Sequence, residues 1–135
     1  MTGQEIVNKA LEYVGTPWHH TGRVKHIGID CAGLIVCTLR ELGAVIEDET
    51  RYTMDDEFAI LNSKMHEYCD EATTAHQGDI LIFRGRLMYN HCGFYNNGRL
   101  IHAYSSPSVM KVVETTIDSN WIGRLYGIYR FRGVK

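Results

Sequence analysis

The spacing of apolar residues changes at Gln77-Gly78, and this change constrains the fold most strongly. Before it, apolar residues recur at intervals of three and four, as on the buried face of a helix. After it come short segments rich in β-branched and aromatic residues and separated by turn residues: DILIFR, CGFYNN, RLIHAY, KVVETT and YGIYRF. Helices followed by strands predict an α+β fold, in which amino-terminal helices pack on an antiparallel sheet of about five strands that follow one another as a meander.

Two helices are well marked in the first half. Thr2 and Glu5 have the capping-box spacing, so a helix is expected over about residues 3–14. A second helix begins at Cys31, which follows a potential capping residue, and Gly43 supplies a stop. Residues 15–30 between them read as a structured loop.

The segment 47–57, EDETRYTMDDE, is acidic and is expected to be a solvated loop. It ends in a potential cap at Asp55 or Asp56, before a short third helix through Phe58, Leu61 and Met65.

Composition excludes several classes of protein. A chain of 135 residues with 44% hydrophobic residues fits one domain, residues 1–135, with a single core. Its net charge of −2 gives no basic footprint for nucleic acid or an anionic membrane, and no apolar stretch is long enough for membrane insertion. The amino-terminal residues lack a signal-peptide pattern, so we expect a protein that is cytoplasmic on synthesis, and its four cysteines are expected to be free thiols.

Cys31 is a candidate nucleophile, because a thiol at a helix amino terminus is favoured as the thiolate, above all beside a histidine. The residues Asn97-Gly98 favour a two-residue type I′ turn, which pairs Gly93 with His102 in the two strands that it joins. In this register the side chains of His91 and His102 project from the same face of the sheet, so His91 is a candidate for that histidine. In this scheme Cys31 attacks, His91 takes its proton and His102 orients His91, provided that the second helix presents its first turn to that face.

Other readings of these residues stay open. A cysteine on an apolar helical stripe is usually a core residue. The chain also holds several soft metal ligands, including His19, His20 and His26, but none at zinc-finger spacing, so a metal site is not expected.

The segments GTPWHHTGRVKHIGIDCAGLIV, GDILIFR and NHCGFYNNGRLIHA resemble the NlpC-type cell-wall cysteine peptidases, which have a compact papain-like fold. The tail WIGRLYGIYRFR is similar to the last strand of the branch carried by phages and prophages. The resemblance implies a Cys31-His91-His102 triad, hydrolysis of peptidoglycan stem peptides, commonly between γ-D-glutamate and a diamino acid, and no cofactor.

The resemblance also implies substrate-binding positions. Asp30 would bind the free amine of a stem peptide in addition to capping the helix, whereas Ala32 replaces a serine that usually follows the nucleophile. Trp18 and His20 lie where the family often has a tyrosine, and His20 is the closer match. Cys92 stands where a small aliphatic residue is expected, so it is read as a core residue.

Two alternatives remain for the function. One alternative to the peptidase is a non-enzymatic phage-tail or assembly subunit with an idle site. The other is an amidase or acyltransferase that uses the same residues on a different acyl group. For the peptidase reading, the expected partners are the stem-peptide substrate and phage tail proteins. A protein without a signal peptide would reach the cell wall as part of a phage particle.

Overall fold

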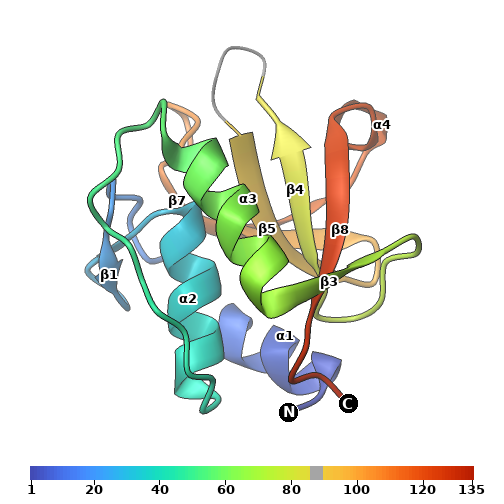
Figure 1. Ribbon diagram of the computed structural model, residues 1–135. Coiled ribbons are helices and arrows are strands. Elements are labelled where there is room, and N and C mark those ends of the chain that lie inside the picture. The colour runs from blue at the N-terminus through green and yellow to red at the C-terminus, as the bar shows by residue number, and fades with distance from the viewer. Residues whose placement is uncertain (86–89) are drawn as a thin grey trace.

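The computed structural model describes residues 1–85 and 90–135, and of Phe58 the backbone only. Figure 1 shows the first three helices on one side of a large sheet. The helices within the described residues are α1 (Gly3–Leu11), α2 (Cys31–Glu41), α3 (Glu57–Tyr68) and α4 (Ser119–Ile122). The strands are β1 (Arg23–Val24), β2 (Gly28–Ile29), β3 (Cys69–Ala72), β4 (Ile80–Arg84), β5 (Asn90–Asn96), β6 (Arg99–Tyr104), β7 (Lys111–Thr116) and β8 (Leu125–Phe131).

Six strands form one sheet in the order β3-β8-β4-β5-β6-β7, and their pairings are antiparallel. The α+β fold is therefore confirmed, and the five expected strands are β4 to β8. Two details differ from the expectation. The strand β3 was not predicted, because its sequence CDEA is short and polar, and β8 returns to pair with β4 instead of following β7.

The helix starts follow local signals. Thr2 Oγ1 accepts a hydrogen bond from the Glu5 amide at 3.1 Å and Glu5 Oε1 accepts one from the Thr2 amide at 3.2 Å, so the predicted capping box is present. The helix ends at Leu11, earlier than expected. Asp30 caps α2 by accepting from the Gly33 amide at 2.8 Å, and Gly43, with a φ of +93°, follows the end of α2.

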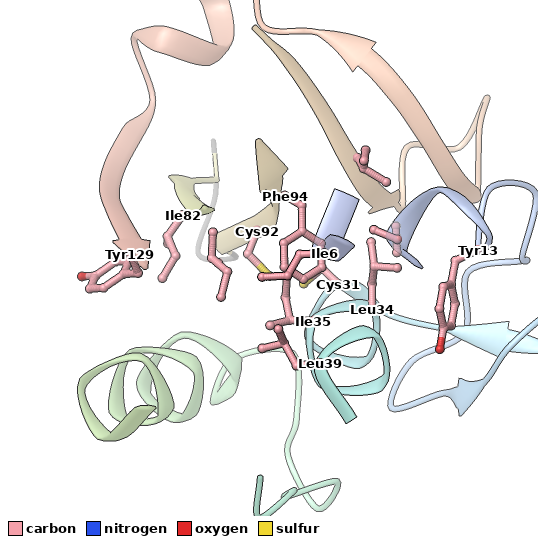
Figure 2. Packing of buried hydrophobic residues seen from close by; sticks show 14 of the residues in the cluster. Ile6, Tyr13, Cys31, Leu34, Ile35, Leu39, Ile82, Cys92, Phe94 and Tyr129 are labelled. Carbon is pink, nitrogen blue, oxygen red and sulfur yellow. The ribbon is translucent and has the colours of Figure 1, made fainter. Parts of the chain in front are cut away.

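The helix α2 packs on one face of the sheet only. Cys31, Leu34 and Ile35 of α2 lie in one core cluster with alternate sheet residues, as Figure 2 shows for Cys92 and Phe94. The residues between these alternate ones point to the opposite face, where Phe83, Leu100 and Trp121 belong to a second cluster. The sheet thus separates two apolar layers. None of the described helices is long and apolar enough to cross a membrane.

Candidate active site

Cys31 is the first residue of α2 and only 4% of it is exposed. Its Sγ donates a hydrogen bond to Oε1 of Glu57, the first residue of α3, at 3.0 Å. On the sheet side it lies next to Cys92, which is fully buried (Figure 2). Cys92 is therefore a core residue, as expected.

The surroundings of Cys31 oppose the thiolate. The neighbouring Cys92 thiol, burial, and the negative charges of Glu57 and Asp30 raise the pKa of Cys31 well above its usual value. A helix amino terminus stabilises a negative charge by only about 0.3–1 kcal/mol. The expected thiolate is thus not favoured in this arrangement, because burial and two carboxyl groups outweigh the helix.

His91 and His102 form the pair that the hairpin register predicts. The pairing of Phe94 with Ile101 sets the register, and His91 Nε2 lies 2.6 Å from His102 Nδ1. Gly93 makes room between them, since a Cβ at this position would lie 2.9 Å from the His102 Cβ. The two rings are 4.9 Å apart between centroids.

A third polar group extends this pair. His102 Nε2 lies 2.9 Å from Thr115 Oγ1 on β7. If His102 donates to Thr115 through Nε2, its Nδ1 accepts from His91 Nε2, and Nδ1 of His91 keeps a free lone pair. That tautomer is the one in which His91 can accept a proton.

An apolar cover keeps both imidazoles neutral. Trp121 of α4 is 7% exposed and packs on both rings, with centroid distances of 5.6 Å to His91 and 5.3 Å to His102. Burial lowers the pKa of His102 to about 4, and burial and the neighbouring His102 lower the pKa of His91 well below its usual value.

This burial predicts a loss of stability in mild acid. Above pH 6.5, His102 is neutral in both the folded and the unfolded chain. Between pH 6.5 and about pH 4, His102 is protonated in the unfolded chain but stays neutral in the folded chain, because burial has lowered its pKa to about 4. We expect the free energy of unfolding to fall by on the order of 3 kcal/mol across this window through His102 alone. Urea unfolding at several pH values measures it. The variant His102→Asn should show a shallower decline, and an equal decline in both proteins would contradict the assignment.

Cys31 and His91 are not hydrogen-bonded to each other in the described part of the structure. The sulfur is bonded to Glu57 instead. The expectation that α2 faces the histidine side of the sheet is wrong, because α2 packs against Cys92 and the alternating strand turns the preceding His91 to the other face. The two residues nevertheless lie at the same end of β5, since Cys92 adjoins both.

Asp30 is surrounded by donors that use all its acceptor positions. Its Oδ1 accepts from the Gly33 amide at 2.8 Å and from Arg23 at 2.9 Å. Its Oδ2 accepts from the Thr21 amide at 2.8 Å and from the hydroxyl of Tyr52. Asp30 is 1% exposed and holds the start of α2 in place, so no acceptor position remains for a substrate amine in this conformation.

Trp18 and His20 lie together beside this network. Their rings are stacked with centroids 6.4 Å apart, and the His20 ring meets Tyr52 edge-on at 5.5 Å. His20 Nε2 also lies 3.1 Å from the Tyr52 carbonyl oxygen. Ala32 lines a groove between α2 and α3 that Glu57 also lines.

The remaining histidines of this loop lie apart from the site. His19 and His26 are exposed. Among the described residues, no group of three or more histidine, cysteine, aspartate or glutamate side chains could hold a metal ion.

The sequence did not predict that residues 47–57 contribute side chains to the candidate active site. Tyr52 and Glu57 are each 6% exposed, so the expected solvated loop is wrong for these two. Arg23, also missed, bonds to Asp30, Asp48 and Tyr52 at once. The one available signal was Tyr52, the single aromatic residue in this acidic segment. Asp56 does precede α3, but its side chain makes no capping hydrogen bond.

Comparison with known families decides the classification. A family model described as the NlpC/P60 family matches residues 15–130. The chain belongs to the NlpC/P60 family. No curated protein sequence matches it.

Solved structures of the same family share this fold. An NLP/P60-family protein from Staphylococcus aureus, described as similar to a lipoprotein, is 21% identical with a TM-score of 0.69, and the match covers 96% of this chain and 41% of that one. The NlpC/P60 domain of the peptidoglycan hydrolase SagA is 22% identical with a TM-score of 0.66, over 97% and 100% of the two chains. The peptidoglycan hydrolase RipB of Mycobacterium tuberculosis is 19% identical with a TM-score of 0.64, over 98% and 65%. The chain thus spans well under half of the staphylococcal protein.

Proposed function

We propose that this NlpC/P60 protein is a cysteine peptidase that hydrolyses peptidoglycan stem peptides, with Cys31 as nucleophile. The observation that carries the proposal is the 2.6 Å contact between His91 and His102 at the strand end that adjoins Cys31. Two structural neighbours bear the name peptidoglycan hydrolase. The bond we propose is the one between γ-D-glutamate and a diamino acid.

The reaction would begin with rotation of the Cys31 side chain away from Glu57. Because Cys31 and His91 lie on opposite faces of the sheet, they would have to meet around the end of β5, where the proton of Cys31 would pass to Nδ1 of His91. His102 orients Nε2 of His91, and Sγ then attacks the carbonyl carbon. The amide of Cys31, at the start of α2, would donate to the oxyanion. His91 then protonates the leaving amine, and water hydrolyses the thioester. Trp121 keeps the imidazole pair dry.

Digestion of purified muropeptides, followed by mass spectrometry of the products, tests the proposal. We expect products cut after γ-D-glutamate. Intact muropeptides after prolonged incubation with folded protein would contradict a peptidase. A covalent adduct at Cys31 with a different acyl donor would instead identify an amidase or acyltransferase.

One observation favours a second candidate, a non-enzymatic subunit with an idle site. Cys31 is bonded to Glu57, not to His91, and its surroundings raise its pKa. Thiol labelling at graded pH separates the two candidates, because an idle Cys31 reacts only as an ordinary or more basic thiol titrates.

For either candidate we propose a phage or prophage tail as the place of action. This rests on the resemblance of the carboxyl-terminal segment to the phage branch. Detection of the protein in purified particles by mass spectrometry supports it, and detection only in free cytosol contradicts it.

A further inference from the structure

The imidazole of His102 lies between two hydrogen-bonding groups in a site that is otherwise apolar. His102 is fully buried, and the rings of Trp121 and Tyr104 pack against its ring. Its Nδ1 lies 2.6 Å from His91 Nε2, and its Nε2 lies 2.9 Å from Thr115 Oγ1. In the described part of the chain, these are the two hydrogen bonds of the ring. The proton of this imidazole must therefore point either to His91 or to Thr115.

The register of β6 and β7 places Thr115 beside His102. His102 pairs with Val113, and Leu100 pairs with Thr115. Thr115 is thus the diagonal neighbour of His102 on the same face of the sheet, at a separation that an imidazole ring spans. The next residue, Thr116, points to the opposite face. Thr115 is therefore the residue through which β7 reaches the histidine pair.

Two arrangements of protons satisfy both contacts, because a neutral imidazole has one N–H group and one acceptor nitrogen. Burial lowers the pKa of both histidines, so both rings are neutral near pH 7. In the first arrangement, His102 Nε2 donates to Thr115, His91 Nε2 donates to His102 Nδ1, and His91 Nδ1 keeps a free lone pair. In the second, Thr115 donates to His102 Nε2, His102 Nδ1 donates to His91 Nε2, and His91 Nδ1 carries the proton. The first arrangement alone leaves a nitrogen of His91 that can accept the proton of Cys31.

The surroundings favour the first arrangement at both ends of this network. His91 Nδ1 has no hydrogen-bond partner among the described atoms, and an N–H group without an acceptor is costlier than an unused lone pair. At the other end Thr115 is half-buried, so water satisfies its hydroxyl proton when its oxygen accepts from His102. The hydroxyl oxygen of Thr115 is thus the acceptor that this arrangement requires.

We propose that Thr115 is a positioning residue: its hydroxyl oxygen accepts the Nε2 proton of His102, and this holds both imidazoles in the tautomer in which His91 Nδ1 is free. When Cys31 gives its proton to Nδ1, His91 still donates through Nε2 to His102, so no other proton has to move. The inference rests on the proposed function in taking Cys31 as the nucleophile. It adds a residue on β7 that the proposed function does not require.

The substitution Thr115→Val tests the proposal, because valine has nearly the shape of threonine and lacks the hydroxyl. A proton on His102 Nε2 would then be a buried donor without an acceptor, so we expect both rings to shift to the second arrangement, with their protons on Nδ1. Nitrogen-15 NMR of protein with labelled histidines reads these positions at neutral pH, because a protonated ring nitrogen and an unprotonated one have distinct chemical shifts.

Two control variants separate the hydroxyl from local packing. Thr115→Ser keeps the hydroxyl and should keep the wild-type tautomers. Thr116→Val removes a hydroxyl from an exposed position on the same strand, where it accepts from Arg99 at 3.2 Å, and should leave the tautomers unchanged. A proton on His91 Nδ1 in the wild type would overturn the proposal whether or not any variant folds. A folded Thr115→Val protein with the wild-type tautomers would overturn it as well.

Hydrolysis of stem peptides then separates this inference from the proposed function. Thr115→Val should lower kcat about tenfold or more with KM nearly unchanged, because the hydroxyl orients the base and does not touch the substrate, and Thr115→Ser should keep most of the wild-type kcat. Failure of the wild type to cleave stem peptides would refute the proposed function, while the NMR tautomers still decide what Thr115 does. An unchanged kcat in a Thr115→Val protein whose tautomers have shifted would refute the link between this tautomer and catalysis.

Discussion

Replacing Cys31 with alanine is expected to reduce the hydrolysis of stem peptides by about a thousandfold or more, because loss of a nucleophile removes the covalent route entirely. The fold should persist. The substitution deletes one sulfur atom from a buried site and leaves Glu57 without its donor, which costs about 1–3 kcal/mol. Product formation by mass spectrometry and urea unfolding measure the two effects on the same protein.

Cys37→Ala is the matched control for this substitution. Cys37 lies on the same helix, is half-buried, and its only described bond is to the Arg23 carbonyl oxygen at 3.5 Å. We expect it to retain full activity. If the Cys31→Ala protein cleaves muropeptides at the rate of the Cys37→Ala protein, Cys31 is not the nucleophile.

The largest effect on stability is expected at Asp30. Replacing it with alanine removes the cap of α2, one of the two carboxylates that bind the Arg23 guanidinium, and the acceptor of the Tyr52 hydroxyl. Loss of one partner of a buried ion pair costs about 3–5 kcal/mol, which is a large part of the stability of a small domain. Urea unfolding should therefore show a much lower midpoint, or no folded baseline.

A second helix cap supplies the control. Asp118 caps α4 by accepting from the Trp121 amide at 3.0 Å, but it is exposed and makes no ion pair in the described part of the chain. Asp118→Ala should cost only about 0.5–2 kcal/mol, the usual value of a cap. If Asp30→Ala lowers the free energy of unfolding by no more than Asp118→Ala does, Asp30 stabilises the protein only as a helix cap, and its bonds to Arg23 and Tyr52 contribute nothing to stability.

The histidine pair could be predicted because its geometry is local. Asn97 and Gly98 adopt positive φ angles of +46° and +83°, as a type I′ turn requires, and this turn fixes the register of the two strands that it joins. Since side chains alternate along a strand, the register alone decides that His91 and His102 share a face. A segment of only twelve residues, 91–102, thus determines a 2.6 Å contact.

The position of Cys31 relative to this pair could not be predicted in the same way. Sequence periodicity marks which side of α2 is buried, but not which face of the sheet it covers. In the structure α2 covers the face of Cys92 and Phe94, and residues of α1 and α2 lie with these two in one core cluster. The choice of face depends on the packing of several elements at once.

The sequence by itself determined the α+β layout, the starts of α1 and α2, and the histidine pair, because caps, periodicity and tight turns are signals written within a few residues. Only the tertiary structure placed Tyr52 on Asp30 and Glu57 on Cys31, across separations of 22 and 26 residues. The sequence around an acidic residue in a polar segment looks the same whether the side chain is solvated or is buried against a thiol. The fold decides between these environments, since burial depends on which distant side chains close over the residue.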